Sequence, residues 1–174
     1  MVNENKNYSC CIIGHRKIKE FMLVTMATRD KLIDLIKNRN VSVFKFGYYG
    51  EFNDFCYKTL SGLKFIYPHI KLILYTLNNE IAYTFEEAEQ YKSKSKIRDK
   101  DFKYQCFDEF VYLDDIDETK FKYACVLRNK KLIDESDFYL IYHREDYSLP
   151  NNRNSGTKIA YDYACKQKKK MIIP

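Results

Sequence analysis

Glycine, proline and tryptophan are scarce in this sequence: its 174 residues include five glycines, three prolines and no tryptophan. A chain with so few breaking residues has no Pro- or Gly-rich linker, and we find no internal repeat. Charged residues make up 31% and hydrophobic residues 45%, as in folded globular proteins and unlike disordered ones. The length fits one domain with a sizeable core.

Long hydrophobic runs are also lacking. No apolar stretch approaches the roughly 20 residues that a membrane-spanning helix requires. The segment 1–7 is polar, which is unlike the start of a secretory signal peptide. We therefore expect a cytoplasmic protein without a membrane partner.

The sequence has no metal-ligand spacing. None of the six cysteines forms a Cys-x-x-Cys pair, and the three histidines, at positions 15, 69 and 143, are far apart. We therefore expect no metal and no other cofactor. The cysteines are expected to be reduced, mostly buried thiols, as is usual in cytoplasmic proteins.

Charge of one sign is in moderate excess, with a formal net charge of +6. Part of it lies in the cluster Lys166–Lys170, where lysine suits the negative end of a helix dipole. The remaining positive charge is spread out, and no stripe of basic and aromatic residues is present, so nucleic acid is not an expected partner. The charge can still attract an anionic ligand.

What the sequence does contain is a regular alternation of short apolar strands and amphipathic helices. This alternation predicts an α/β fold, a single Rossmann-like, doubly wound domain over residues 1–174 with a mostly parallel sheet. The expected strands are Ser9–Ile13, Val41–Phe46, Lys71–Tyr75, Phe110–Leu113, Phe138–Tyr142 and Met171–Ile173.

Four helices are expected between these strands. They run from after Arg16 to about Arg39, from after Asp54 to Ile66, from about Glu118 to Asp134 and from Thr157 to about Lys169. Residues 77–106 are the most polar stretch and are expected to form an exposed excursion. The first helix is expected to bury a stripe of apolar residues at spacings of three and four, comprising Leu23, Met26, Ala27, Leu32, Ile33, Leu35 and Ile36.

Four of the five glycines fall at strand-to-helix turns, namely Gly14, Gly47, Gly50 and Gly156. Glycine lets the backbone turn tightly or approach another group closely. The carboxyl edge of a parallel sheet also presents helix N-termini, whose free N–H groups and positive dipole suit phosphate. These positions therefore predict a ligand site at that edge, with turn chemistry alone as the alternative explanation.

The polar pair His15 and Arg16 directly follows the first strand, at the same edge. A planar guanidinium such as that of Arg16 pairs well with phosphate oxygens. Taken in isolation, the pair also fits a structural explanation, in which Arg16 is a solvated surface charge and His15 caps the helix.

Several motifs resemble, in order along the chain, those of the SLOG superfamily, the Rossmann-like group that contains DprA, the LOG phosphoribohydrolases and the YspA/YpsA-like proteins. The resemblance is closest to small YspA-like members. It rests on Gly14-His15-Arg16, Gly47–Gly50 followed by Phe52 and Asp54, Tyr67-Pro68, the segments Phe107–Tyr112 and Arg128–Asp137, and Ser155-Gly156-Thr157.

The resemblance implies a pocket for a phosphorylated nucleotide derivative, ADP-ribose-like or a nucleoside phosphate, and a homodimer. Superfamily members occur in bacterial conflict systems, so it also implies a role in phage defence. The implied ligand-binding residues are Gly14, His15, Arg16, Gly47, Tyr48, Gly50, Glu51, Asp54, Arg128, Ser155, Gly156 and Thr157.

The chemistry of these residues suggests their parts. The turn Ser155–Thr157 offers N–H and hydroxyl donors to phosphate, and Arg16 and Arg128 offer guanidinium groups. For Arg128 the alternative is an ion pair on the helix surface with Asp134 or Glu135.

The remaining candidates suit the base and the sugar. The rings of Tyr48 and Tyr49 can stack on a base or ribose, and the carboxylates of Glu51 and Asp54 can accept hydrogen bonds from ribose hydroxyls. For the tyrosines the alternative is packing in the core.

One departure from the family pattern bears on catalysis. The LOG enzymes have a Gly-Gly-x-Gly-Thr-x-x-Glu turn whose glutamate serves cleavage of an N-glycosidic bond; here Asn152-Arg153 replaces the glycine pair and Ala160 stands at the glutamate position. Asp162 lies about 200° further round the helix, which leaves Glu51 as the catalytic candidate. We therefore expect a binding module that acts as a sensor or sequestering protein. The alternative is an N-glycosidic bond hydrolase acting on nucleoside monophosphates.

Overall fold

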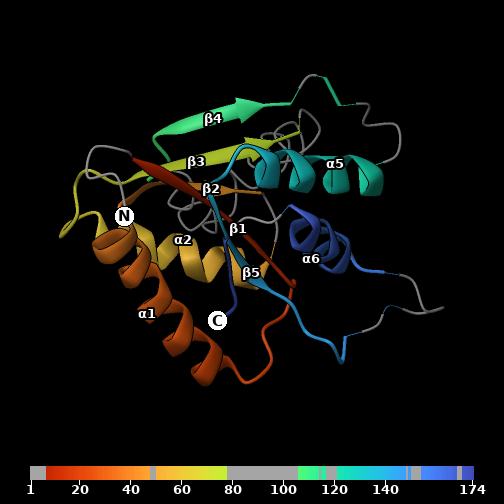
Figure 1. Ribbon diagram of the computed structural model, residues 1–174, viewed down its shortest axis with the longest axis horizontal. Coiled ribbons are helices and arrows are strands. Elements are labelled where there is room, and N and C mark those ends of the chain that lie inside the picture. Colours follow the sequence, from red (N-terminus) through yellow and green to blue (C-terminus); the bar gives the residue numbers. More distant parts are fainter. Residues whose placement is uncertain are drawn as a thin grey trace, which may run out of the picture.

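The protein is a doubly wound α/β domain built on one parallel sheet (Figure 1). The computed structural model describes residues 7–47, 50–77, 106–113, 115–116, 121–147, 149, 154–167 and 170–174. Within these residues, six strands pair in the order β4-β3-β2-β1-β5-β6, and every pair is parallel. The strands are β1 Tyr8–Gly14, β2 Val41–Phe46, β3 Lys71–Thr76, β4 Glu109–Tyr112, β5 Phe138–Tyr142 and β6 Lys170–Ile172.

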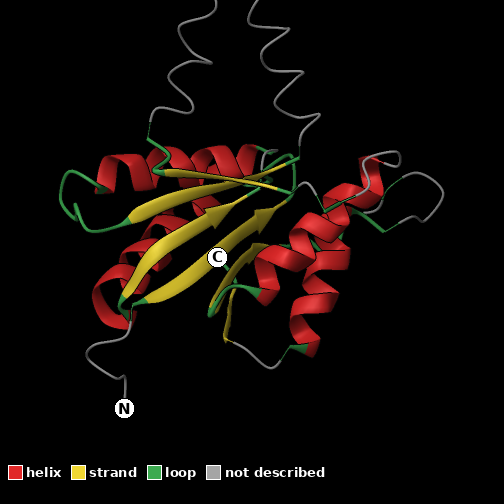
Figure 2. Cartoon of the chain, turned by 90° about the horizontal axis from the view of Figure 1, so that it is seen from above, coloured by secondary structure: helices red, strands yellow, loops and turns green. Residues whose placement is uncertain are grey.

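Helices cover both faces of the twisted sheet (Figure 2). One face packs against α1 Phe21–Arg39 and α2 Glu51–Leu63, and the other against α5 Phe121–Asp134 and α6 Gly156–Lys166. The predicted fold class is confirmed. None of the described helices is both long enough and apolar enough to cross a membrane.

The central strand β1 supplies both hydrophobic cores because its side chains alternate between the two faces. Cys10 and Ile12 pack in the core under α1 and α2, and Cys11 and Ile13 pack in the core under α5 and α6. All four are at most 3% exposed, which explains why the strand reads as one continuous apolar run.

The strand order reverses beside β1. From β1 the chain moves outward through β2, β3 and β4, and then returns to place β5 on the other side of β1. In open α/β sheets, the crevice beyond the carboxyl ends of the strands at such a switch point is where ligands bind. The pairing of Gly14 with Tyr142 marks this point in the sheet.

The expected element boundaries agree with the structure to within a few residues. The main shift is at α2, which begins at Glu51, so that Glu51 and Asp54 lie in its first turn and not in the preceding loop. Helix α6 ends at Lys166, before the expected end near Lys169. The expected polar excursion lies almost wholly outside the described residues, since 78–105 are not among them.

The predicted apolar stripe of α1 is wrong in its first half. Leu23 and Met26 are 67% and 63% exposed, whereas Thr25 and Thr28 are buried. Leu32 fixes the inward face, and Thr28 and Thr25 precede it by four and seven residues, the spacing of one helix face. The Thr25 hydroxyl donates to the carbonyl of Phe21 at 2.7 Å, which satisfies it inside the helix.

This orientation of α1 predicts opposite effects at two apolar positions. Leu32→Ala should lower the free energy of unfolding by about 2–5 kcal/mol, because it empties a fully buried site. Met26→Ala should change the free energy of unfolding of a single chain by no more than about 0.5 kcal/mol, because Met26 is exposed there. Urea unfolding of the two variants measures both values, and equal losses would contradict the orientation.

Candidate functional site

Two strand-to-helix turns are joined at the carboxyl edge of the sheet. The backbone N–H of Glu51, at the start of α2, donates to the carbonyl of Arg16 at 3.0 Å. The Glu51 carboxylate in turn accepts a hydrogen bond from the N–H of Ile18 at 2.7 Å. The turn after β1 and the turn after β2 therefore form one unit, as the sequence predicted for a shared edge.

Two glycines permit this contact. Gly50 has φ 122° and ψ 147°, a backbone conformation that is essentially restricted to glycine. A Cβ atom at Gly50 would lie 3.4 Å from the Arg16 Cα and from the His15 carbonyl oxygen, and one at Gly14 would lie 2.4 Å from the ring of Phe52. Other residues of the protein therefore occupy the space that a side chain at either glycine would need.

Arg128 is buried in α5 and reaches the turn after β2. Only 4% of the residue is exposed, so the alternative of an ion pair on the helix surface is wrong. A Cβ atom at Gly47 would lie 3.1 Å from its Nε and 3.3 Å from its Cζ, which places the guanidinium directly against this turn. The carbonyl of Gly47 accepts a hydrogen bond from the Asn53 side chain at 3.3 Å.

His15 lies at the switch point and is 3% exposed. Its backbone N–H donates to the carbonyl of Tyr142 at 3.3 Å, and its ring packs against those of Tyr142, His143 and Tyr147, with centroid distances of 6.1, 5.6 and 4.4 Å. It is not a helix cap, because Glu20 occupies that position of α1. Arg16, by contrast, is exposed.

The environment of His15 favours the neutral imidazole. Burial, followed by the charges of His143 and Arg144, lowers the pKa of His15 to about 4, and the opposing charge of Asp146 does not reverse this. Among the described residues, no hydrogen-bond partner meets its Nε2 atom.

The turn after β5 is fastened to the turn after β1. The Asp146 carboxylate accepts from the Lys19 ammonium at 2.8 Å and from the Arg144 Nε at 3.0 Å. The Tyr142 hydroxyl accepts from the backbone N–H of Lys19 at 3.0 Å. These two cations hold the pKa of the Asp146 carboxyl well below its usual range.

Sequence reasoning assigned no contact to the beginning of the turn after β5, although His143 and Arg144 follow β5 as His15 and Arg16 follow β1. Two His-Arg pairs after two strands of one parallel sheet were the available signal, because parallel strands end at the same edge.

The N-terminus of α6 forms the third turn. The Ser155 hydroxyl caps the helix by accepting from the N–H of Lys158 at 3.1 Å. Gly156 is exposed, and a Cβ there would have no neighbour within 4 Å, while Thr157 is buried. The ring of His143 stacks on that of Tyr161 of α6 at 4.5 Å, which links this helix to the cluster around His15.

The candidate carboxylates have structural neighbours. One oxygen of Glu51 is engaged by Ile18, and Asp162 pairs with Lys158 at 2.6 Å on the surface of α6. Ala160 is 1% exposed and lies in the core under α5 and α6. The candidate Tyr48, with its neighbour Tyr49, lies outside the described residues.

The described part of the chain contains no group of three or more His, Cys, Asp and Glu side chains that can hold a metal ion. All six cysteines carry free thiols. A comparison with models of protein families gives no match for this chain, and a comparison with curated protein sequences gives none either.

Substitution by alanine should change the stability of the protein differently at Gly50 and at Gly156. Gly50→Ala should lower the free energy of unfolding by about 1–3 kcal/mol, because its backbone conformation is strained for any other residue. Gly156→Ala should leave it unchanged or raise it by up to about 1 kcal/mol, because this helical position is open. Thermal or urea unfolding compares the two, and equal stability of both variants would contradict the geometry at Gly50.

Proposed function

We propose that the chain binds a phosphorylated nucleotide derivative, ADP-ribose-like or a nucleoside phosphate, across the carboxyl edge beside β1, and acts as a sensor or sequestering protein. The observation that carries the proposal is that a buried arginine, an exposed arginine and two helix N-termini all lie at the carboxyl edge of the sheet. An anionic ligand suits this set of positive groups.

The two helix N-termini differ in what they offer to phosphate. Helix α2 carries Glu51 and Asp54 in its first turn, so its positive dipole end is already matched by its own carboxylates. Helix α6 has no acidic residue in its first turn and begins at the exposed Gly156. We therefore propose Ser155–Thr157 as the place of the phosphate.

Binding without cleavage is the form of this function that the carboxylates support. Ala160, at the position of the LOG glutamate, lies in the hydrophobic core, where a substituted glutamate would be buried among apolar side chains. Glu51 is held by Ile18 in the loop after β1 and braces that loop. A Glu51 carboxylate held in this way is less suited to acid–base assistance of N-glycosidic cleavage.

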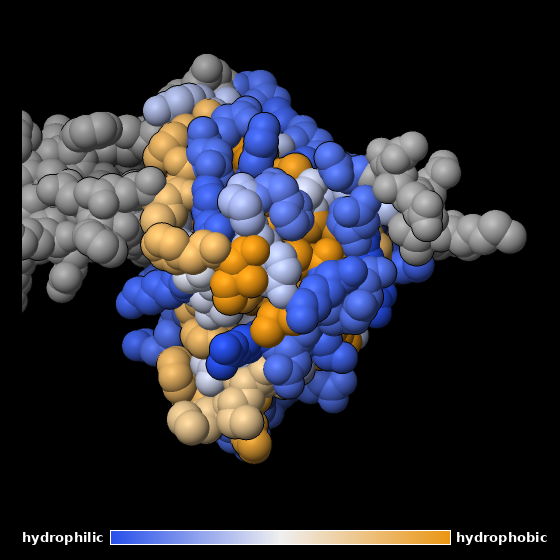
Figure 3. Space-filling view, turned by 90° about the vertical axis from the view of Figure 1, so that its left-hand side faces the viewer, coloured by the Kyte–Doolittle hydropathy of each residue, from blue (hydrophilic) through white to orange (hydrophobic). Residues whose placement is uncertain are grey.

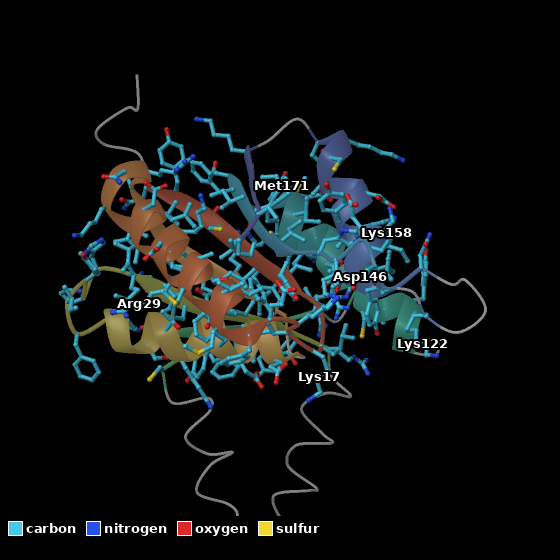
Figure 4. All side chains as sticks on the ribbon, turned by 90° about the horizontal axis from the view of Figure 1, so that it is seen from below. Lys17, Arg29, Lys122, Asp146, Lys158 and Met171 are labelled. Atoms are coloured by element: carbon cyan, nitrogen blue, oxygen red, sulfur yellow. The ribbon has the colours of Figure 1, made fainter. Side chains whose placement is uncertain are left out.

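Arg16 provides the direct test of binding. Arg16→Ala should weaken the binding of ADP-ribose by about 1.5–3 kcal/mol, the size of a hydrogen bond to a charged group. Calorimetry should show this as an increase in Kd of about 10- to 100-fold. Arg29→Ala is the matched control, because Arg29 is an exposed arginine on α1, away from the edge that carries Asp146 and Lys158 (Figure 4). Unchanged affinity in Arg16→Ala would contradict the proposal.

Incubation of the protein with possible ligands separates binding from turnover. Chromatography of AMP, ADP-ribose and deoxynucleoside monophosphates after exposure to the protein should return the ligands intact. Free base that forms with the wild type and disappears with Glu51→Gln would establish the alternative, an N-glycosidic bond hydrolase.

We also propose that the chain forms a homodimer through the first turns of α1. Figure 3 shows hydrophobic atoms gathered at the lower end of the molecule, at the level where α1 begins in Figure 1. The exposed apolar residues of this segment are Phe21, Met22, Leu23 and Met26, between 49% and 70% exposed. A second copy would remove this apolar area from water.

Light scattering should give twice the chain mass of 20.9 kDa for the wild type. The Met22→Lys/Met26→Lys variant should give the mass of one chain, because two charges would enter the apolar contact. A wild-type mass of one chain at micromolar concentration would contradict the dimer.

A further inference from the structure

The imidazole of His15 is buried, and one of its two nitrogens lacks a hydrogen-bond partner among the described residues. It is 3% exposed, and among the described residues its Nε2 atom meets no hydrogen-bond partner. Buried polar atoms in native proteins nearly always have a partner, so an unsatisfied one calls for an explanation, such as a group that the free protein lacks.

Packing fixes the direction of this ring. The rings of Tyr142, His143 and Tyr147 surround it, and its backbone N–H is bound to the Tyr142 carbonyl. The preceding Gly14 is packed against Phe52 of α2. Because the backbone N–H of His15 and the preceding Gly14 are both held, rotation of the His15 ring toward water would have to displace the turn after β5.

Burial and the neighbouring charges exclude His15 as a cation for phosphate. Burial favours its neutral form, protonation is further opposed by His143 and Arg144, and Asp146, which favours protonation, is itself paired with Lys19 and Arg144. The imidazole is therefore neutral near pH 7, and a neutral ring forms ordinary hydrogen bonds with uncharged groups. Permanent positive charge at this edge comes from the exposed Arg16 and from Arg128 of α5, whose guanidinium lies against Gly47.

One of the two carboxylates expected to bind the sugar is engaged elsewhere. Glu51, a candidate acceptor for ribose hydroxyls, accepts the N–H of Ile18 and braces the loop that carries His15. In a nucleotide the ribose lies directly beside the phosphate. The ring of His15 contacts that of His143, which stacks on Tyr161 of α6, the helix whose N-terminus is the proposed phosphate site. A neutral hydrogen-bonding group on this side of the edge suits the sugar.

We propose that Nε2 of His15 hydrogen-bonds to a ribose hydroxyl of the ligand and makes the site selective for ribonucleotides over deoxyribonucleotides. This inference rests on the proposed function, since it assigns one contact within that nucleotide site. A hydroxyl suits either tautomer of the ring, because it both donates and accepts. A ligand without the hydroxyl would leave Nε2 unpaired in the complex, which is the arrangement that gives strong discrimination.

The experiment compares AMP with 2′-deoxy-AMP and 3′-deoxy-AMP by calorimetry. The wild type should bind AMP about 5- to 100-fold more tightly than at least one deoxy analogue. His15→Phe keeps the ring and removes Nε2, and should bind AMP and that analogue equally. His15→Gln carries an amide near the Nε2 position and should recover part of the preference.

His69→Phe is the matched control. His69 is exposed and lies before β3, at the amino edge of the sheet, so the preference for AMP should match that of the wild type. Urea unfolding checks that His15→Phe is folded; we expect it to be at least as stable as the wild type, because an unsatisfied buried polar atom is removed.

Three outcomes would overturn the inference. If His15→Phe keeps the wild-type preference for AMP, the inference fails and the proposed function stands. If His15→Phe weakens all three ligands equally and histidine NMR of the wild type shows protonation of His15 on binding, then His15 contacts the phosphate. If the wild type binds neither AMP nor ADP-ribose, the proposed function fails and the inference fails with it.

Histidine NMR of the wild type also serves if His15→Phe does not fold. AMP should then shift the ring signals of His15 without protonating it, and the deoxy analogue that binds more weakly should shift them less. Identical shifts with AMP and with both deoxy analogues would overturn the inference.

Discussion

The contact between the backbone at Gly50 and the backbone at Arg16 is the constraint on which the carboxyl edge depends. It needs a residue without a side chain at Gly50, in a conformation that other residues rarely adopt. Once it forms, α2 starts against the loop after β1, and Glu51 closes that loop through Ile18. The position of His15 between the rings of the neighbouring turn follows from this contact and from the pairing of β1 with β5.

The charged groups at the carboxyl edge of the sheet come from different helices. Helix α2 brings carboxylates, and these serve its own N-terminus and the adjoining loop. Helix α5 brings the guanidinium of Arg128 from inside the protein, and α6 brings a capped N-terminus without acidic residues. The positive groups of these two helices are therefore not matched by carboxylates in a first turn, in contrast to the N-terminus of α2.

Most of the fold could be predicted because a parallel strand buried on both faces has a simple signature. The apolar runs that form β1, β2 and β5 gave their bounds nearly to the residue. The inward face of α1 could not be read in the same way. Thr25 and Thr28 bury their methyl groups and, for Thr25, satisfy the hydroxyl within the helix, so hydropathy alone pointed to the wrong side.

The candidate site was predictable where a local rule applied and not where packing decided. Glycine at strand ends located the turn after β1, at Gly14, and the turn after β2, at Gly47 and Gly50, and the structure brings these two turns together. The burial of Arg128 depends on the distance between α5 and Gly47, which no sequence spacing contains. The same holds for the contact of His15 with Tyr147, which joins segments more than a hundred residues apart along the chain.

The turn that covers His15 is held by charged groups that water reaches. Lys19 and Asp146 are 57% and 52% exposed in their side chains, and Arg144 pairs with the same carboxylate. Dissolved salt screens such pairs over about 8 Å at physiological ionic strength, whereas the stacking of His143 on Tyr161 is unaffected by it. Ionic strength therefore weakens the attachment of this turn to the loop after β1 and leaves its attachment to α6 unchanged.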